Sequence, residues 1–136
     1  MMTPTNMRAV WLVGLLLVGG APASAHHSEA AQFDPEDPVS VEGVIVKVEW
    51  ANPHIWYYVD VTGENGEVTT WGFSGLPPGV LLRRGVTRDV LKVGDAVRVS
   101  GNRARDGSNN ASGYRVTFAD GRSVFTGSTE TTEPQP

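Results

Sequence analysis

The chain has 136 residues, no cysteine, and an excess of acidic over basic residues that gives a formal net charge of −4. This size allows one small domain with one core, and the absence of cysteine excludes disulfides and a lipid anchor on cysteine. The mild acidity argues against general nucleic-acid binding, which normally requires a basic surface.

The first 25 residues have the layout of a secretory signal peptide. One positive charge at Arg8 precedes an apolar run of about a dozen residues, and the small-residue segment APASA follows it. A membrane-spanning helix needs about 20 apolar residues, so an uncleaved anchor is the less favoured interpretation. We expect cleavage after Ala25, with Ala23 as the alternative, and a periplasmic or secreted protein that does not insert into the membrane.

Two polar segments flank the expected domain, which spans residues 39–125. Residues 26–38 contain two prolines and predict an irregular N-terminal arm, with Phe33 as its one anchor. Residues 126–136 contain no large apolar side chain, so they bury too little surface to offset the entropy cost of ordering. We expect this tail to be disordered.

The first strand pattern contains a change of face. Its apolar residues fall on odd positions before Gly43 and on even positions after it, with Ile45 as the exception: Val39, Val41, Val44, Val46, Val48 and Trp50. A change of face at a glycine is typical of a β-bulge, which bends a strand. We therefore expect a bulge at Gly43 and a bent first strand that serves both sides of a closed barrel.

The second strand alternates between two faces after a break at Asn52-Pro53. One face carries Ile55, Tyr57, Val59 and Val61, and the other carries His54, Trp56, Tyr58 and Asp60. Asn65-Gly66 then predicts a hairpin turn. The third strand is expected at residues 68–73, with Trp71 and Phe73 on one side.

The second half of the chain predicts one short helix at residues 80–84, ended by Gly85, and three more strands. The strands are expected at 96–100, 114–118 and 123–125, with residues 102–113 as a loop and with these side chains inward: Val97, Val99, Tyr114, Val116 and Phe118. This order predicts an all-β fold, a small five- to six-stranded OB-like Greek-key barrel with one short helix between strands three and four. A small open sandwich is the alternative.

Several segments together resemble an uncharacterised family of short secreted bacterial proteins. They include AHHSEAAQFDPEDP, ANPHIWYYVDV and LKVGDAVRVSG, which carry a His-His-Ser start, a Phe-Asp pair, an Asn-Pro-His motif and a Gly-Asp turn. The resemblance covers His26 to about Gly127 and implies a periplasmic OB-like domain of unknown function. The segment FSGLPPG departs from the family, where a polar loop without proline is usual.

Three histidines, His26, His27 and His54, suggest a metal site. Cleavage after Ala25 would place the new α-amine beside the imidazole of His26, and such nitrogen ligands suit the tetragonal coordination of Cu(II). His54 would complete a copper site if the arm folded back, and the alternative cut leaves Ser-Ala-His, which also binds Cu(II). The competing interpretation is that the terminal histidines bind nothing and that His54 hydrogen-bonds within a turn.

Strand two also suggests a ligand-binding face made of Trp56, Tyr58 and Asp60. The face of strands two and three is a common ligand surface in OB barrels, where aromatic rings stack on sugars or bases. Two competing interpretations are that this side packs under the N-terminal arm against Phe33, or that the strand is inverted and the rings form the core. The acidity of the chain makes nucleic acid the least favoured ligand.

A basic cluster of Arg83, Arg84 and Arg88 suggests an anion or an acidic partner, although a solvated helix face explains it equally well. The acidic residues that could pair with this cluster are Asp34, Glu36 and Asp37. The chain lacks a nucleophile elbow, a phosphate loop and a cysteine nucleophile. We therefore expect an exported, non-enzymatic binding protein that binds copper, or alternatively a small molecule or a protein through strand two.

Overall fold

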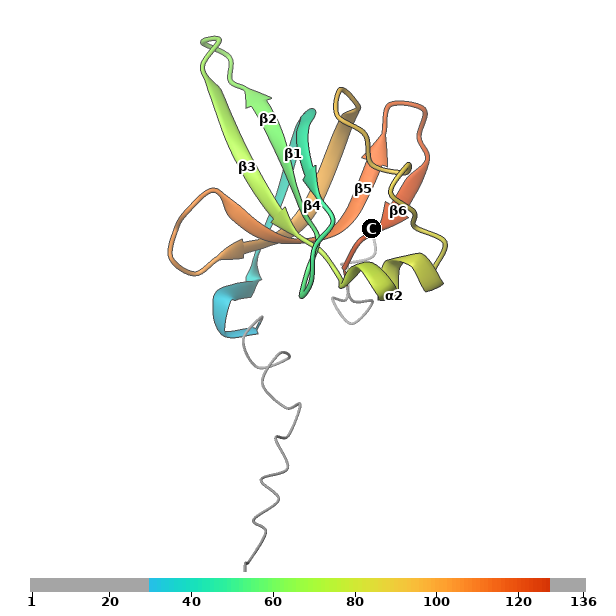
Figure 1. The fold of residues 1–136 in the computed structure, drawn as a ribbon. Helices are drawn as coiled ribbons and strands as arrows, with labels where there is room; N and C mark the ends of the chain where they lie inside the picture. Colours follow the sequence, from blue (N-terminus) through green and yellow to red (C-terminus); the bar gives the residue numbers. More distant parts are fainter. Residues whose placement is uncertain (1–29, 128–136) are drawn as a thin grey trace, which may run out of the picture.

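The computed structural model describes residues 30–127, so the expected signal peptide, His26 and His27 lie outside the described range. A helical turn at residues 30–32 is followed by β1 (Phe33–Glu49), β2 (Trp56–Thr62), β3 (Val68–Ser74), α2 (Pro78–Arg83), β4 (Ala96–Ala104), β5 (Asn110–Phe118) and β6 (Ser123–Phe125) (Figure 1). No helix in the described part is long and apolar enough to span a membrane. The predicted β class and the short helix between strands three and four are confirmed.

The six strands form one sheet in the order β3-β2-β1-β4-β5-β6. Neighbours in this order are antiparallel, and β3 additionally pairs in parallel with β5, where Gly72–Ser74 face Asn110–Ser112. Strand β3 is therefore hydrogen-bonded to both β2 and β5. This pairing joins the first and the fifth strands of the sheet order, β3 and β5.

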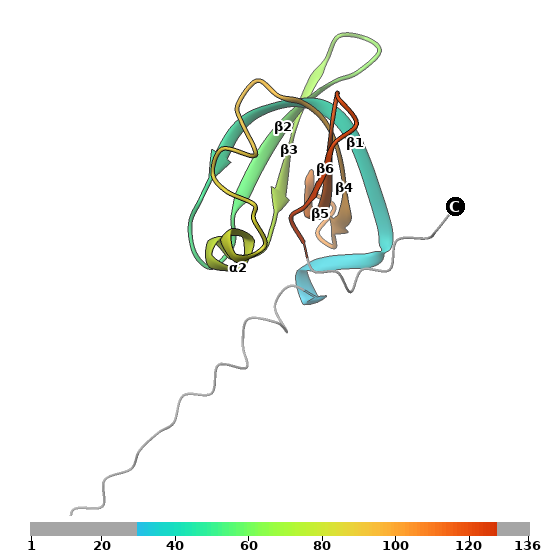
Figure 2. The same cartoon turned by 90° about the vertical axis from the view of Figure 1, so that its right-hand side faces the viewer.

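Strand β1 is long and strongly curved (Figure 2). Its first part pairs with β4 and its second part with β2, and Val44 is paired with both strands. The irregularity in its pairing with β2 lies between Ile45 and Lys47, so the predicted bulge at Gly43 is misplaced. The backbone of Ile45 forms hydrogen bonds with Gly94 and Asp95 in the turn before β4. These bonds hold the Ile45 side chain in the core and leave Val46 as the extra residue.

The predicted irregular arm is strand from Phe33 onward. Phe33 pairs with Ala104 and is only 4 % exposed, and Pro38 pairs with Asn102. Pro35 and Pro38 are accommodated because the pairing of β1 with β4 is irregular between Phe33 and Pro38. Phe33 is thus an anchor, as expected, but it anchors a strand.

The core lies between the curved parts of the sheet. The predicted alternation of β2 is confirmed, because Ile55, Tyr57 and Val59 are completely buried while Trp56 and Tyr58 are partly exposed. The buried residues that form the core cluster are Ile45, Ile55, Tyr57, Val59, Phe73, Leu81, Val86, Leu91, Val97, Val99, Ala111, Val116 and Phe118.

The predicted loop at residues 102–113 is mostly strand, because β4 and β5 extend through it. Gly101 pairs with Gly113 and Ser100 with Arg115, so Tyr114 is an extra residue at a register shift. The shift moves Tyr114 out of the alternation, which leaves its side chain partly exposed instead of inward. Val116 and Phe118 are buried as predicted.

The predicted disordered tail begins too early in the chain. Thr126 is completely buried, its N–H donates to the carbonyl of Tyr114, and its own carbonyl accepts from Leu76. A polar side chain can be buried at this position because each of its hydrogen-bonding groups has a partner. Residues 128–136 lie outside the described range.

Candidate ligand-binding face

Three rows of paired residues cross the outer side of β1, β2 and β3, and most of them expose their side chains, whereas Gly72 and Ser74 are buried. Directly paired residues lie on the same face of a sheet. The rows are Glu49-Trp56-Ser74, Lys47-Tyr58-Gly72 and Val44-Asp60-Thr70, and Asn110 of β5 is paired with Gly72. We call the surface made by Lys47, Glu49, Trp56, Tyr58, Asp60, Thr70 and Asn110 the aromatic face. The structure thus brings together the predicted residues Trp56, Tyr58 and Asp60.

The two rings of the aromatic face lie side by side along β2. The centroids of Trp56 and Tyr58 are 6.4 Å apart, and their planes differ by 23°. Both side chains are partly exposed. Successive outward positions of one strand therefore present two nearly parallel rings as one apolar strip. The expectation that they are core residues of an inverted strand is wrong.

Charged side chains fix the position of Tyr58. Its hydroxyl donates a hydrogen bond of 3.1 Å to Glu49 Oε2, and Lys47 Nζ lies 5.2 Å from the ring centroid. Lys47 and Glu49 also form an ion pair of 2.6 Å. The bond to Lys47, followed by the bond to Tyr58, lowers the pKa of Glu49, and the same ion pair raises the pKa of Lys47. Partial burial and the hydrogen bond to Glu49 raise the pKa of Tyr58.

Polar groups border the rings on the β3 side. Asp60 Oδ1 accepts a hydrogen bond of 2.6 Å from Thr70 Oγ1. At Gly72, an added Cβ would lie 2.5 Å from Asn110 Oδ1 and about 3.5 Å from both rings. The missing side chain therefore lets the amide of Asn110, which donates to Ser108 Oγ, approach the rings. Sequence reasoning missed this contribution of β5, because the parallel pairing of β3 with β5 leaves no local pattern.

His54 is the only one of the three predicted metal ligands within the described residues. Its Nδ1 lies 2.7 Å from the carbonyl oxygen of Gly75. Since a carbonyl only accepts, Nδ1 is the donor in this bond, which leaves Nε2 as the ring nitrogen that could bind a metal. His54 therefore does form a hydrogen bond, but its partner lies 21 residues away, after β3, and not within its own turn as expected. Among residues 30–127, no group of three or more His, Cys, Asp or Glu is placed to hold a metal ion.

The predicted basic cluster divides among different contacts. Arg84 Nη1 donates to the carbonyl of Gly127 at 3.4 Å, and the guanidinium of Arg88 lies 5.8 Å from the Trp50 ring centroid. Arg83 is exposed in the last turn of α2. Asp34 forms its ion pair with Arg105, at 3.1 Å, rather than with this cluster.

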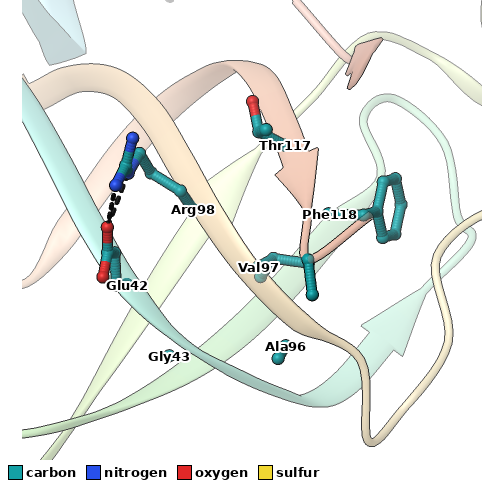
Figure 3. Close-up of a pocket in the computed structure, with 8 residues that line it drawn as sticks. Glu42, Gly43, Ala96, Val97, Arg98, Thr117 and Phe118 are labelled. Atoms are coloured by element: carbon teal, nitrogen blue, oxygen red, sulfur yellow. Dashed lines mark hydrogen bonds and ion pairs between the residues drawn. The ribbon is translucent and has the colours of Figure 1, made fainter. Parts of the chain in front are cut away.

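The described surface also carries shallow hollows away from the aromatic face. The one in Figure 3 has a volume of about 370 Å³ and lies along β1, β4 and the end of β5. Its walls include the ion pair of Glu42 with Arg98 and the ring of Phe118. The ion pair lies on one side of this hollow, and Thr117, Phe118 and small or aliphatic residues line the rest. The aromatic face offers a richer combination of stacking and hydrogen-bonding groups.

A family model described as "Family of unknown function (DUF6152)" matches residues 14–114. No curated protein and no solved structure gives a significant match. The expected resemblance to an uncharacterised family is confirmed at this level. The family description names no activity, so functional conclusions depend on the residues themselves.

Proposed function

The chain belongs to this family of unknown function, and we propose that it is an exported, non-enzymatic binding protein that holds its ligand on the aromatic face. The observation that carries the proposal is the pair of parallel, partly exposed rings of Trp56 and Tyr58 beside hydrogen-bonding groups. Aromatic side chains with an exposed face and few rotatable bonds are effective anchors for ligands. The signal-peptide layout of residues 1–25 supports export to the periplasm or beyond.

The strand pairings support an OB-like Greek-key barrel as the scaffold. The ring of pairings runs β1-β2-β3-β5-β4 and back to β1, and α2 lies between β3 and β4 in the sequence. In OB folds, the face of strands two and three is a frequent binding surface. The aromatic face occupies the equivalent strands in this chain.

The ionisation of the charged groups favours binding over catalysis. A general acid or base works best with a pKa near the working pH. The lowered pKa of Glu49 and the raised pKa of Lys47 both move away from neutrality, so both groups stay charged. Fixed charges of this kind orient a ligand and hold Tyr58 in place.

The test is a nuclear magnetic resonance screen of the processed protein with fragments that include sugars, aromatic compounds and short peptides. We expect the amide shifts caused by binding fragments to concentrate on Trp56, Tyr58, Asp60 and Thr70 and to disappear in Trp56→Ala. Phe125→Ala is the matched control, because Phe125 is an aromatic residue that is 48 % exposed on β6. Shifts that concentrate elsewhere, or that survive Trp56→Ala, would contradict the proposal.

Copper binding is a second candidate function, favoured by the state of His54. A metal-bound histidine usually donates its other ring N–H to a carbonyl or carboxylate, and His54 donates Nδ1–H to Gly75. Figures 1 and 2 both place residues 30–32 at the same end of the sheet as the β1–β2 connection that carries His54. His54 could therefore join His26 and His27 in one copper site.

Calorimetric titration of the processed protein with Cu(II), after an intact mass has identified its first residue, tests this candidate. We expect one tight site that is lost in His26→Ala and weakened at least tenfold in His54→Ala. The Cu(II) affinity of His27→Ala shows how much the third histidine contributes to the site. Weak binding that is unchanged by all three substitutions would refute copper as the ligand.

A further inference from the structure

We propose that the ligand of the aromatic face is a neutral oligosaccharide. This inference rests on the proposed function of that face and adds the chemical class of the ligand. Three properties of the surface lead to it: the direction of its apolar strip, the sign of its charge, and the balance of its hydrogen-bond donors and acceptors.

The apolar strip is elongated, because Trp56 and Tyr58 follow one another along β2 with nearly parallel planes. A ligand that covers both rings needs flat apolar surfaces repeated along its length. Sugar rings in an oligosaccharide have this form, and so do the bases of a single-stranded nucleic acid.

The charge of the aromatic face argues against a single-stranded nucleic acid as its ligand. Glu49 and Asp60 border the rings with two carboxylates, and Lys47 is already paired with Glu49. Single-strand binding surfaces follow the phosphate backbone with positive charge, whereas this face repels phosphate. The same repulsion acts against acidic polysaccharides.

The hydrogen-bonding groups separate a sugar from an apolar or proline-rich peptide. Ionised carboxylates only accept hydrogen bonds, and each has about four acceptor sites, of which Glu49 uses two, for Lys47 and Tyr58, and Asp60 uses one, for Thr70. A ligand that displaces water at both borders of the rings must therefore donate hydrogen bonds there. Sugar hydroxyls donate and accept, while a proline residue has no N–H to donate. The nearby amide of Asn110 can both donate and accept.

The face is also ordered before a ligand arrives. The hydroxyl of Tyr58 is held by Glu49, its ring lies between Lys47 and the Gly72 position, and the ring of Trp56 lies beside it. Side chains that are already fixed lose little conformational entropy on binding. This order favours a ligand such as a sugar, which gains only modest energy from each contact.

The experiment titrates the processed protein with maltohexaose, cellohexaose and chitohexaose, each to about 10 mM, because weak binding in the millimolar range is sufficient to detect. The readouts are calorimetry and the backbone amide resonances of Tyr58, Asp60 and Thr70, which are present in the natural protein and in the Trp56 variants. We expect at least one hexasaccharide to bind, with affinity reduced at least tenfold in Trp56→Ala, several-fold in Asp60→Asn, and little in Trp56→Phe. Phe125→Ala should leave the affinity unchanged, and thermal melts confirm that each variant is folded.

A hexathymidine and a proline-rich decapeptide serve as competing probes. If no hexasaccharide binds but one of these does so through Trp56, the carbohydrate inference is overturned and the proposed function stands. If none of the probes perturbs the aromatic face, both are overturned. Oligosaccharide binding that survives Trp56→Ala would place the sugar elsewhere and overturn the inference.

Discussion

Two neighbouring tyrosines of β2 show how one strand serves two purposes. Tyr57 is completely buried, and its hydroxyl donates at 2.9 Å to Thr126, which in turn donates to the carbonyl of Gly113. Tyr58 points outward, and its hydroxyl bonds to the charged Glu49. Burial raises the pKa of Tyr57 far above its usual value, so its hydroxyl remains a donor at any physiological pH. The same residue type closes the core on one face and forms part of the aromatic face on the other.

The largest expected effect is the difference in unfolding free energy between Tyr57→Ala and Tyr58→Ala. Tyr57→Ala leaves a large cavity and removes the donor to the Thr126 hydroxyl, and we expect a loss of about 3–5 kcal/mol in the free energy of unfolding. Tyr58→Ala acts on a partly exposed ring, and we expect less than about 1 kcal/mol. Urea denaturation of both variants measures the difference. Similar losses would mean that the outer tyrosine is also part of the core.

Two glycines beside these rings extend the comparison. A Cβ at Gly113 would lie 2.2 Å from the Tyr57 hydroxyl, inside the packed core, so Gly113→Ala should cost about 1–3 kcal/mol of unfolding free energy. At Gly72 the close atom is the end of the Asn110 side chain, which can move. Gly72→Ala should therefore cost less than about 1 kcal/mol while it displaces Asn110 and weakens ligand binding. Denaturation should show the larger loss of stability in Gly113→Ala, and sugar titration should show the larger loss of affinity in Gly72→Ala. The same ranking in both measurements would contradict this prediction.

The hydroxyl of Thr126 gives the next effect. Thr126→Val keeps the shape of the side chain but removes the partner of Tyr57 and of the Gly113 carbonyl, and we expect a loss of about 1–2 kcal/mol. Thr117→Val is the matched control, because the Thr117 hydroxyl forms its hydrogen bond with the Ser123 hydroxyl at an exposed position. Tyr57→Phe in the Thr126→Val background should recover part of the loss, and a failure to recover would show that the hydroxyl pair is not coupled.

The outer face should give the smallest effect, seen as a dependence on pH. The pKa of Glu49 is lowered in the folded protein from its ordinary value of 4.5, so this carboxylate stabilises the fold above that value. The stabilisation is lost as the pH falls through the lowered pKa. We expect the unfolding free energy of the natural protein to fall more steeply with acid than that of Glu49→Gln. Identical slopes would show that the contact of Glu49 with Lys47 and Tyr58 adds nothing to stability.

The alternation of β2 could be predicted because one of its faces is buried throughout and the other is not. That pattern identified Trp56, Tyr58 and Asp60 as neighbours on one surface. Their environment could not be predicted in the same way. Lys47 and Glu49 reach the face through the register of β1 with β2, which a bulge at Val46 determines. Asn110 reaches it through a parallel pairing between strands that are distant in sequence.

The errors at the ends of the domain have a common physical origin. Residues 34–38 and Thr126 are polar or proline, and hydrophobicity alone assigns them to solvent. Their pairing or burial depends on partners in β4 and β5, such as Asn102 for Pro38 and Gly113 for Thr126. The prediction that Tyr114 points inward is wrong for a different reason: it assumes strict alternation, which a register shift between β4 and β5 interrupts.

The hydrogen bond between Tyr57 and Thr126 joins residues that are 69 positions apart, and it has a consequence for how the chain folds during its synthesis. Until Thr126 has left the ribosome, the buried tyrosine lacks its partner and β5 lacks its final anchor. Folds dominated by such distant contacts form slowly, because the entropy of closing long loops is lost before the stabilising contacts form. The native packing around Tyr57 can therefore be completed only after nearly all of the domain has been made.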